Sequence, residues 1–103
     1  MSTGTADIGL IGLGTMGAAL AANIAEKGFR IAVWNRHGDV TKDFAANAGP
    51  LADRIVPTRT LADLVAALKP PRAVILMVPA GPVVDQQIAA LRKQIGALEA
   101  ALD

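Results

Sequence analysis

Short apolar runs separated by longer mixed segments make up most of the chain. Four runs stand out by their apolar, β-branched or aromatic composition: DIGLIG (residues 7–12), FRIAVWN (29–35), RIVP (54–57) and RAVILMVP (72–79). Runs of this length are typical of buried strands. We therefore predict four strands, and the last one carries the strongest signal.

The segments between the runs carry helix signals. Apolar residues recur every four positions across residues 15–27, and Gly28 follows as a helix C-terminal glycine would. A second helix is predicted over residues 40–47. Thr60, three residues before Asp63, is expected to cap a third helix, which the prolines of the segment LKPP would end.

Strands that alternate with helices require a parallel sheet with right-handed crossovers. The predicted fold is therefore α/β: a parallel sheet of about four strands, with flanking helices and a long C-terminal helix. The strand order expected is 3-2-1-4, as in one half of a doubly wound sheet. The chain has 103 residues, the size of one ordinary domain, and no repeat or linker divides it.

The C-terminal helix has one apolar seam, interrupted only by Gly96. Its members recur at alternating spacings of four and three residues: Val84, Ile88, Leu91, Ile95, Leu98 and Leu102. The main interpretation is that the seam packs on the sheet. The alternative is that part of it meets a helix of a partner, although the seam is shorter than three heptads.

Composition and charge exclude several function classes. The net charge is +1 and the basic residues are scattered, so no nucleic-acid partner is expected. Residues 8–25 carry no charge, but their glycines, together with Thr15 and Asn23, argue against a membrane span. The absence of cysteine removes thiolate chemistry and fits a reducing cytoplasm. No metal site is predicted.

The segment GLGTMG (residues 12–17) follows the first predicted strand and opens the first predicted helix, the setting in which G-x-G-x-x-G is typical of dinucleotide binding. Gly12 would allow the tight turn, Gly14 would let a pyrophosphate approach the backbone, and Gly17 would let the helix close on the strand. The helix N-terminus offers N–H groups to the phosphates. The alternative is a purely structural turn. The predicted pyrophosphate site comprises Gly12, Leu13, Gly14, Thr15, Met16 and Gly17.

The end of the second predicted strand bears on the choice of cofactor. Enzymes that prefer NAD place a carboxylate there for the ribose hydroxyl, whereas this chain has Asn35, Arg36 and His37. A guanidinium can bind the 2′-phosphate of NADP, and such a contact is worth about 1.5–3 kcal/mol. We predict a preference for NADP, with NAD weaker. The alternative is that Arg36 is a solvated loop residue. The sequence does not decide whether His37 contacts the phosphate. The carboxylate of nearby Asp39 weakens the argument for NADP over NAD.

Two sequence blocks point to a known family. DIGLIGLGTMGAALAANIAEKGFRIAVWNR resembles the N-terminal region of the β-hydroxyacid dehydrogenase superfamily, which has a Rossmann-like fold. LADLVAALKPPRAVILMVPAGPVVDQQIAAL narrows the resemblance to the 6-phosphogluconate dehydrogenase family. The similarity covers residues 6–91 of one domain, 1–103, and leaves 92–103 as an atypical helical tail.

The resemblance implies a cytoplasmic, usually dimeric enzyme of the pentose phosphate pathway that oxidatively decarboxylates 6-phosphogluconate with NADP. It places residues 12–17 at the pyrophosphate and residues 35–37 at the adenosine phosphate. It also implies that the end of the fourth strand lines the dinucleotide crevice, as ligand placement in open α/β sheets suggests: Val78, Pro79 and Ala80. The family often has Ala in place of Gly14 and Lys in place of Pro79, so one cation near the cofactor is lost.

The greatest departure lies after the fourth helix, where the family continues into another strand and a large helical domain with its catalytic residues. This sequence reads RKQIGALEAALD and stops. We expect a truncated or engineered domain that binds NADP(H), has no catalytic residues of its own and does not decarboxylate sugar acids alone. A minimal NADPH-dependent reductase and a non-binding dimeric scaffold are the alternatives.

Without a fifth strand, the fourth strand would be an exposed hydrophobic edge, which proteins normally cover or pair. We therefore predict a homodimer that buries either this edge or the seam of the C-terminal helix.

Overall fold

A computed structural model describes residues 5–78 and 82–102. The elements alternate along the chain: β1 (Ile8–Ile11), α1 (Thr15–Glu26), β2 (Ile31–Trp34), α2 (Gly38–Ala46), the 3₁₀ helix η1 (Gly49–Arg54), β3 (Ile55–Pro57), α3 (Leu61–Ala67), β4 (Val74–Leu76) and α4 (Pro82–Leu102). All strand pairs are parallel, and the sheet order is β3-β2-β1-β4. The predicted fold class and strand order are confirmed.

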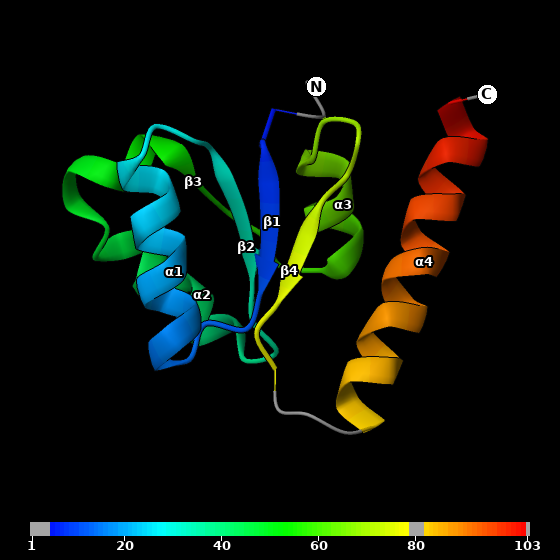
Figure 1. The fold of residues 1–103 in the computed structure, drawn as a ribbon, viewed down its shortest axis with the longest axis horizontal. Coiled ribbons are helices and arrows are strands. Elements are labelled where there is room, and N and C mark those ends of the chain that lie inside the picture. Colours follow the sequence, from blue (N-terminus) through cyan, green and yellow to red (C-terminus); the bar gives the residue numbers. More distant parts are fainter. Residues whose placement is uncertain (1–4, 79–81, 103) are drawn as a thin grey trace.

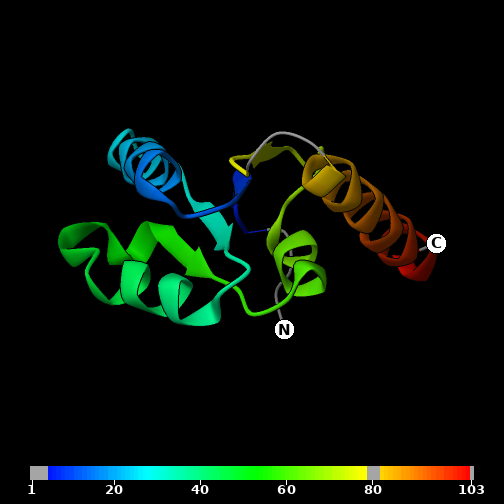
Figure 2. The same ribbon diagram turned by 90° about the horizontal axis from the view of Figure 1, so that it is seen from below.

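The sheet separates two hydrophobic layers (Figures 1 and 2). Leu10 of β1 and Val33 of β2 face the layer formed with α1 and α2, and both are fully buried. Ile11 and Ala32, their neighbours in sequence, face the opposite layer formed with α3 and α4. This alternation buries both faces of the central strands, because successive side chains of a strand point to opposite sides.

Helix α4 packs chiefly against α3 (Figure 2). Its seam residue Leu91 is buried and joins Leu64 and Leu68 of the α3 region in one core cluster. Ile88, one turn earlier, is 37% exposed. The expectation that the seam packs on the sheet is therefore met only in part, and Gly96 does not interrupt the helix.

Two local predictions can be compared with the backbone, and one further element appears that was not predicted. The Thr60 hydroxyl accepts a hydrogen bond from the Asp63 N–H at 3.0 Å, which confirms the cap of α3. Gly28 has a φ of +101°, as a residue that follows a helix C-terminus often does. The helix η1 was not predicted; Gly49, with a φ of +58°, and Pro50 at its start explain it.

The strand β4 is shorter than the apolar run that predicted it. Its ladder partner is β1, which ends where the chain turns at Gly12, and the last bond joins the Met77 N–H to the Ile11 carbonyl at 2.7 Å. β1 offers no further extended residues beyond Ile11, so the ladder between the two strands ends there. The prediction that the strand reaches Pro79 extends beyond the described residues.

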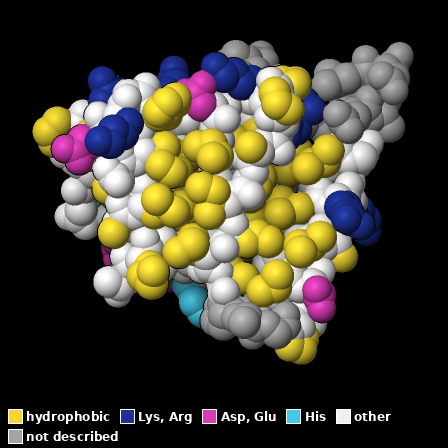
Figure 3. Space-filling model, viewed as in Figure 1, with side chains coloured by type: hydrophobic (Ala, Val, Ile, Leu, Met, Phe, Trp, Pro, Cys, Tyr) yellow, Lys and Arg dark blue, Asp and Glu magenta, His cyan; other side chains and the backbone are white. Residues whose placement is uncertain are grey.

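The two edge strands differ in their surroundings. β3 ends in Pro57, a residue that cannot donate to a further ladder and is typical of edges. β4 consists of three half-buried apolar residues, and its open edge faces the viewer in Figure 1. In the space-filling view, hydrophobic side chains gather over the middle of that face, between α1 and α4 (Figure 3).

Candidate dinucleotide-binding site

The chain leaves β1 through a glycine turn that brings its backbone against β4 and α1. Gly12 has a φ of +101°, and a Cβ placed there would lie 2.1 Å from the Met77 carbonyl oxygen. A Cβ on Gly17 would lie 1.8 Å from the carbonyl oxygen of Gly12. Both contacts are with backbone atoms, which cannot easily move. The roles expected for Gly12 in the turn and for Gly17 in close packing are therefore confirmed.

Gly14 is different, because its surroundings are open. Its φ is −66°, and a Cβ placed there would meet no atom within 4 Å. It is the N-cap residue of α1, where no side chain caps the helix and no acidic residue occupies the first turn. The first N–H groups of an α-helix have no partner within the helix. Gly14, Thr15 and Met16 are all exposed residues, and they lie at the positive end of the α1 dipole.

Both the side chain and the backbone N–H of Leu13 make contacts within the protein. Its side chain is 5% exposed and belongs to the core layer beneath α1. Its backbone N–H donates to Asn35 Oδ1 at 2.8 Å. Although the sequence places Leu13 within the pyrophosphate motif, its amide already has a partner in this structure and its side chain supports the turn.

The end of β2 lies beside this turn, and two hydrogen bonds connect them. The Gly12 N–H donates to the Trp34 carbonyl at 3.0 Å, and the Leu13 N–H donates to the next residue, Asn35. Arg36 and His37 follow in an exposed loop that leads into α2. The structure thus places the predicted phosphate-binding residues at adjacent strand ends on the carboxyl edge of the sheet.

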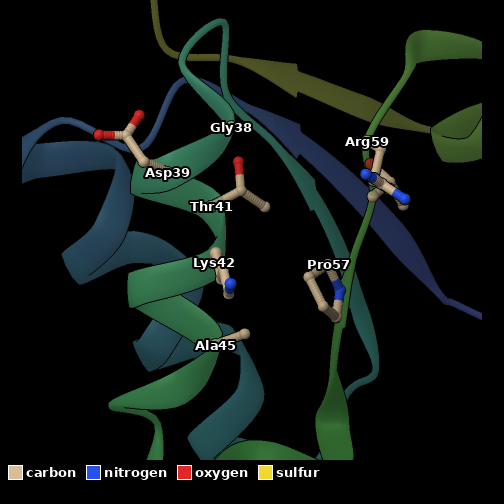
Figure 4. A pocket seen from close by; sticks show the side chains of 8 residues that line it. Gly38, Asp39, Thr41, Lys42, Ala45, Pro57 and Arg59 are labelled. Carbon is tan, nitrogen blue, oxygen red and sulfur yellow. The ribbon is translucent and has the colours of Figure 1, made fainter.

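A cavity of about 640 Å³ lies next to this loop, between α2 and the end of β3 (Figure 4). Lys42 on α2 and Arg59 after β3 bring positive charge to it, whereas the carboxylate of Asp39, which also lines the cavity, points away from Pro57 and Arg59. The indole Nε1 of Trp34 donates to the Arg59 carbonyl at 3.2 Å and so connects the ends of β2 and β3.

Two buried threonines also line this cavity, and both hydroxyls have partners. Thr41 Oγ1 accepts a hydrogen bond from the Asn35 N–H at 3.0 Å, and Thr58 Oγ1 donates to the Val33 carbonyl at 2.8 Å. Sequence reasoning missed Thr41, Arg59 and the cavity. No local pattern marks them, because their partners lie on other segments of the chain.

The third group of predicted cofactor residues is only partly described. Val78 follows β4, is half-buried and packs against the core layer of α3 and α4. Pro79 and Ala80 lie outside the described residues. Over residues 5–78 and 82–102, no three His, Asp or Glu side chains come together as a metal ion would require. Within the same ranges, no helix combines the length and the hydropathy needed to span a bilayer.

The parallel sheet, with a glycine turn that opens α1 at its carboxyl edge, defines a dinucleotide-binding domain of the Rossmann type. The family model described as the NAD binding domain of 6-phosphogluconate dehydrogenase matches residues 7–101. The chain therefore belongs to this family.

Curated relatives agree with this family. The chain is 44% identical over 89 residues to 6-phosphogluconate dehydrogenase, decarboxylating, of Trypanosoma brucei brucei, covering 84% of this chain and 19% of that protein. It is 40% identical over 101 residues to the Drosophila melanogaster enzyme, covering 98% of this chain and 21% of that protein. The chain spans about a fifth of the length of these relatives.

Solved structures show the same fold. The chain matches Plasmodium falciparum 6-phosphogluconate dehydrogenase, studied as the apo form and with NADP+ or 6-phosphogluconate, with a TM-score of 0.77 and 42% identity. That match covers 85% of this chain and 19% of the other. A reductive aminase from Aspergillus terreus in complex with NADPH and ethyl levulinate matches with a TM-score of 0.59 and 31% identity, covering 84% and 27%.

Proposed function

We propose that this chain is an NADP(H)-binding domain in which NADP is preferred to NAD. One observation carries the proposal: an uncapped helix N-terminus at the glycine turn lies beside a strand end that presents Arg36 and His37 and no carboxylate. The first feature suits a pyrophosphate. The second suits a 2′-phosphate, because a guanidinium binds it and residues 35–37 contain no carboxylate to repel it, although Asp39 follows two residues later.

The proposed roles follow from these positions. The exposed backbone of Gly14, Thr15 and Met16 faces the pyrophosphate, while Gly12 and Gly17 allow the turn. The 2′-phosphate is bound by Arg36, with His37 beside it. The crevice beyond β4 is completed by Val78, Pro79 and Ala80. The solved relatives in complex with NADP+ or NADPH support the choice of cofactor.

The activity of the whole protein is a further part of the proposal. The curated relatives are named as decarboxylating 6-phosphogluconate dehydrogenases, and we propose that this domain serves an oxidoreductase of that kind in the cytoplasm. By itself the chain is expected to bind the cofactor without decarboxylating a sugar acid. Oxidation of NADPH above the buffer rate with a small carbonyl substrate would favour a minimal reductase instead.

The experiment is a calorimetric titration with NADP+ and NAD+ of the wild type and of Arg36→Ala. We expect NADP+ affinity to fall about tenfold or more in the variant, with little change for NAD+, because the lost contact is charge-assisted. Lys27→Ala is the matched control, since it removes an exposed cation at the opposite end of α1 and should leave both affinities unchanged. If folded wild-type protein releases no heat with millimolar NADP+, the proposal is contradicted and the non-binding dimeric scaffold is favoured.

We also propose that the chain forms a homodimer through the β4 edge. That edge is apolar and has no proline, whereas β3 ends in Pro57. Ile75 and Met77 on one side, and Val74 and Leu76 on the other, are only half-buried. Pairing with a second copy would satisfy the open backbone groups and cover these side chains.

Ile75→Lys tests this interface, because it places a charge on the half-buried side of β4. We expect the wild type to sediment at twice the chain mass of 10.6 kDa and the variant at the chain mass. Phe29→Lys is the control: it makes a similar change at a residue that is 53% exposed and lies before β2, at the other end of the strands. A monomeric wild type, or equal dissociation of both variants, would contradict the proposed interface.

A further inference from the structure

Asn35 makes hydrogen bonds to three different segments at the carboxyl edge of the sheet. Its Oδ1 accepts from the Leu13 N–H in the glycine turn at 2.8 Å. Its own N–H donates to Thr41 Oγ1 of α2 at 3.0 Å, and its Nδ2 donates to the His37 carbonyl at 3.3 Å. We call these four residues the Asn35 brace. The brace ties the turn, the loop after β2 and α2 together.

Two members of the brace are buried, which makes their hydrogen bonds consequential. Thr41 is 3% exposed and Leu13 is 5% exposed. A buried donor that loses its acceptor is left unsatisfied, and hydrogen bonds away from water are electrostatically stronger. Asn35 is therefore fixed by two hydrogen bonds. Its side-chain oxygen accepts the Leu13 N–H, and its backbone N–H donates to the Thr41 hydroxyl.

The brace controls the place of the loop that carries the positive charge. Arg36 is the next residue after Asn35, and the carbonyl of His37 is held by the Asn35 side chain. Arg36 and His37 are exposed, and His37 is the N-cap residue of α2, where its carbonyl also accepts the Val40 N–H at 3.1 Å. The position of the guanidinium relative to the glycine turn thus depends on contacts made by its neighbour.

We propose that Asn35 and Thr41 are positioning residues for cofactor selectivity. They fix residues 36 and 37, between β2 and α2, relative to the glycine turn, so that Arg36 stands where the 2′-phosphate of a bound NADP lies. Asn35 then positions the loop and does not bind the phosphate itself, because its Oδ1 already accepts the Leu13 N–H and its Nδ2 already donates to the His37 carbonyl. This inference rests on the proposed function, since it concerns the selectivity of the same site.

The first test compares Thr41→Val with Thr41→Ser. Valine keeps the shape of threonine and removes the acceptor of the Asn35 N–H, whereas serine keeps the hydroxyl. We expect Thr41→Val to weaken NADP+ binding about three- to tenfold, the effect of one neutral hydrogen bond. NAD+ binding should change far less, because NAD lacks the 2′-phosphate. Thr41→Ser should keep the wild-type ratio of the NADP+ and NAD+ affinities.

Thr58→Val is the matched control for the loss of a buried hydroxyl. Thr58 is 5% exposed and lines the same cavity, but its hydroxyl donates to the Val33 carbonyl and not to the brace. We expect this variant to lower the unfolding temperature without changing the ratio of NADP+ to NAD+ affinity. A role of Thr41 in stability alone would make the two valine variants behave alike.

The second test needs no cofactor. In ligand-free protein, amide hydrogen exchange followed by NMR should be about three- to tenfold faster at Leu13 in Thr41→Val than in the wild type. Thr41 does not contact Leu13 in any described hydrogen bond, so this effect would have to pass through Asn35. Thr58→Val should leave Leu13 exchange unchanged.

The two tests separate the possible failures. If the folded wild type does not bind NADP+, the proposed function is wrong and the selectivity role falls with it, while Leu13 exchange still decides whether the brace couples the segments. If the wild type binds NADP+ but Thr41→Val weakens both cofactors equally or neither, the positioning role is overturned and the proposed function stands. Unchanged exchange at Leu13 in Thr41→Val also overturns the brace.

Discussion

The two ends of the parallel sheet treat their polar groups in opposite ways. At the carboxyl end, α1 begins without a side-chain cap, and Arg36 and His37 are exposed. At the amino end, α1 finishes with the Gly28 N–H bonded to the Ala25 carbonyl at 3.0 Å, and Arg54 of η1 donates to the same carbonyl at 3.1 Å. One end leaves donors available to a ligand, and the other satisfies its acceptors within the chain.

The same helix therefore serves two purposes. A free helix N-terminus attracts an anion, whereas a helix C-terminus needs donors or positive charge to be stable. At the C-terminal end of α1, the Arg54 guanidinium supplies both a donor and positive charge. At the N-terminal end, a bound anion is expected to accept from the free N–H groups. Substitutions at the amino end should change stability, and those at the carboxyl end should change cofactor binding as well.

Gly12 and Gly28 offer the sharpest test of this comparison, because both have a φ of +101° and they flank α1. Gly12→Ala combines backbone strain with a clash against the Met77 carbonyl, and we expect a loss of about 3 kcal/mol or more in unfolding free energy. Gly28→Ala meets no atom within 4 Å, so strain alone should cost about 1–2 kcal/mol. Urea unfolding measures both.

The functional arm of this experiment is a titration of both variants with NADP+ under conditions where each is folded. Gly28→Ala should bind like the wild type, because it lies at the opposite end of α1. Gly12→Ala should bind poorly even when folded, since the turn that carries the exposed amides must move. Equal losses of stability in the two variants would mean that the close approach to Met77 is not what requires Gly12.

Local signals in the sequence were enough to predict the elements that depend on local chemistry. The Thr60 cap and the glycine after α1 follow from residue types near each other in the chain, and the strand order follows the arrangement of doubly wound sheets. The glycine turn was also predictable, because its spacing reports a backbone that approaches another backbone too closely for a Cβ.

Features that depend on a distant partner could not be predicted in this way. The periodicity of α4 identified its apolar face but not its neighbour, which is chiefly α3. The length of β4 is limited by β1, and no property of its own residues shows that. In the site, Asn35 and Leu13 are 22 residues apart in sequence, so their hydrogen bond could not be foreseen from either motif.

Asp7 provides the smallest expected effect and concerns the amino end. Its side chain forms an ion pair with Lys69, and its Oδ2 accepts the Arg30 N–H at 2.8 Å. The hydrogen bond from Lys69, followed by that from the Arg30 amide, lowers the pKa of the Asp7 carboxyl below its usual 3.8. The carboxylate is thus favoured more in the folded chain than in the unfolded one.

The sign of the pH effect follows from this lowered pKa. The stabilisation from Asp7 is fully present above the unfolded pKa of about 3.9 and is lost as the pH falls through the lower folded value. Asp7→Asn keeps an acceptor for Arg30 but cannot titrate, so it should melt slightly below the wild type at pH 7. Thermal unfolding across pH 2 to 7 should show this difference closing below about pH 4, and added salt should shrink it, since the pair is partly exposed.

A difference that stays constant to the lowest pH would mean that the charge of Asp7 contributes nothing, whereas a changed NADP+ affinity in Asp7→Asn would show that the two ends are not independent.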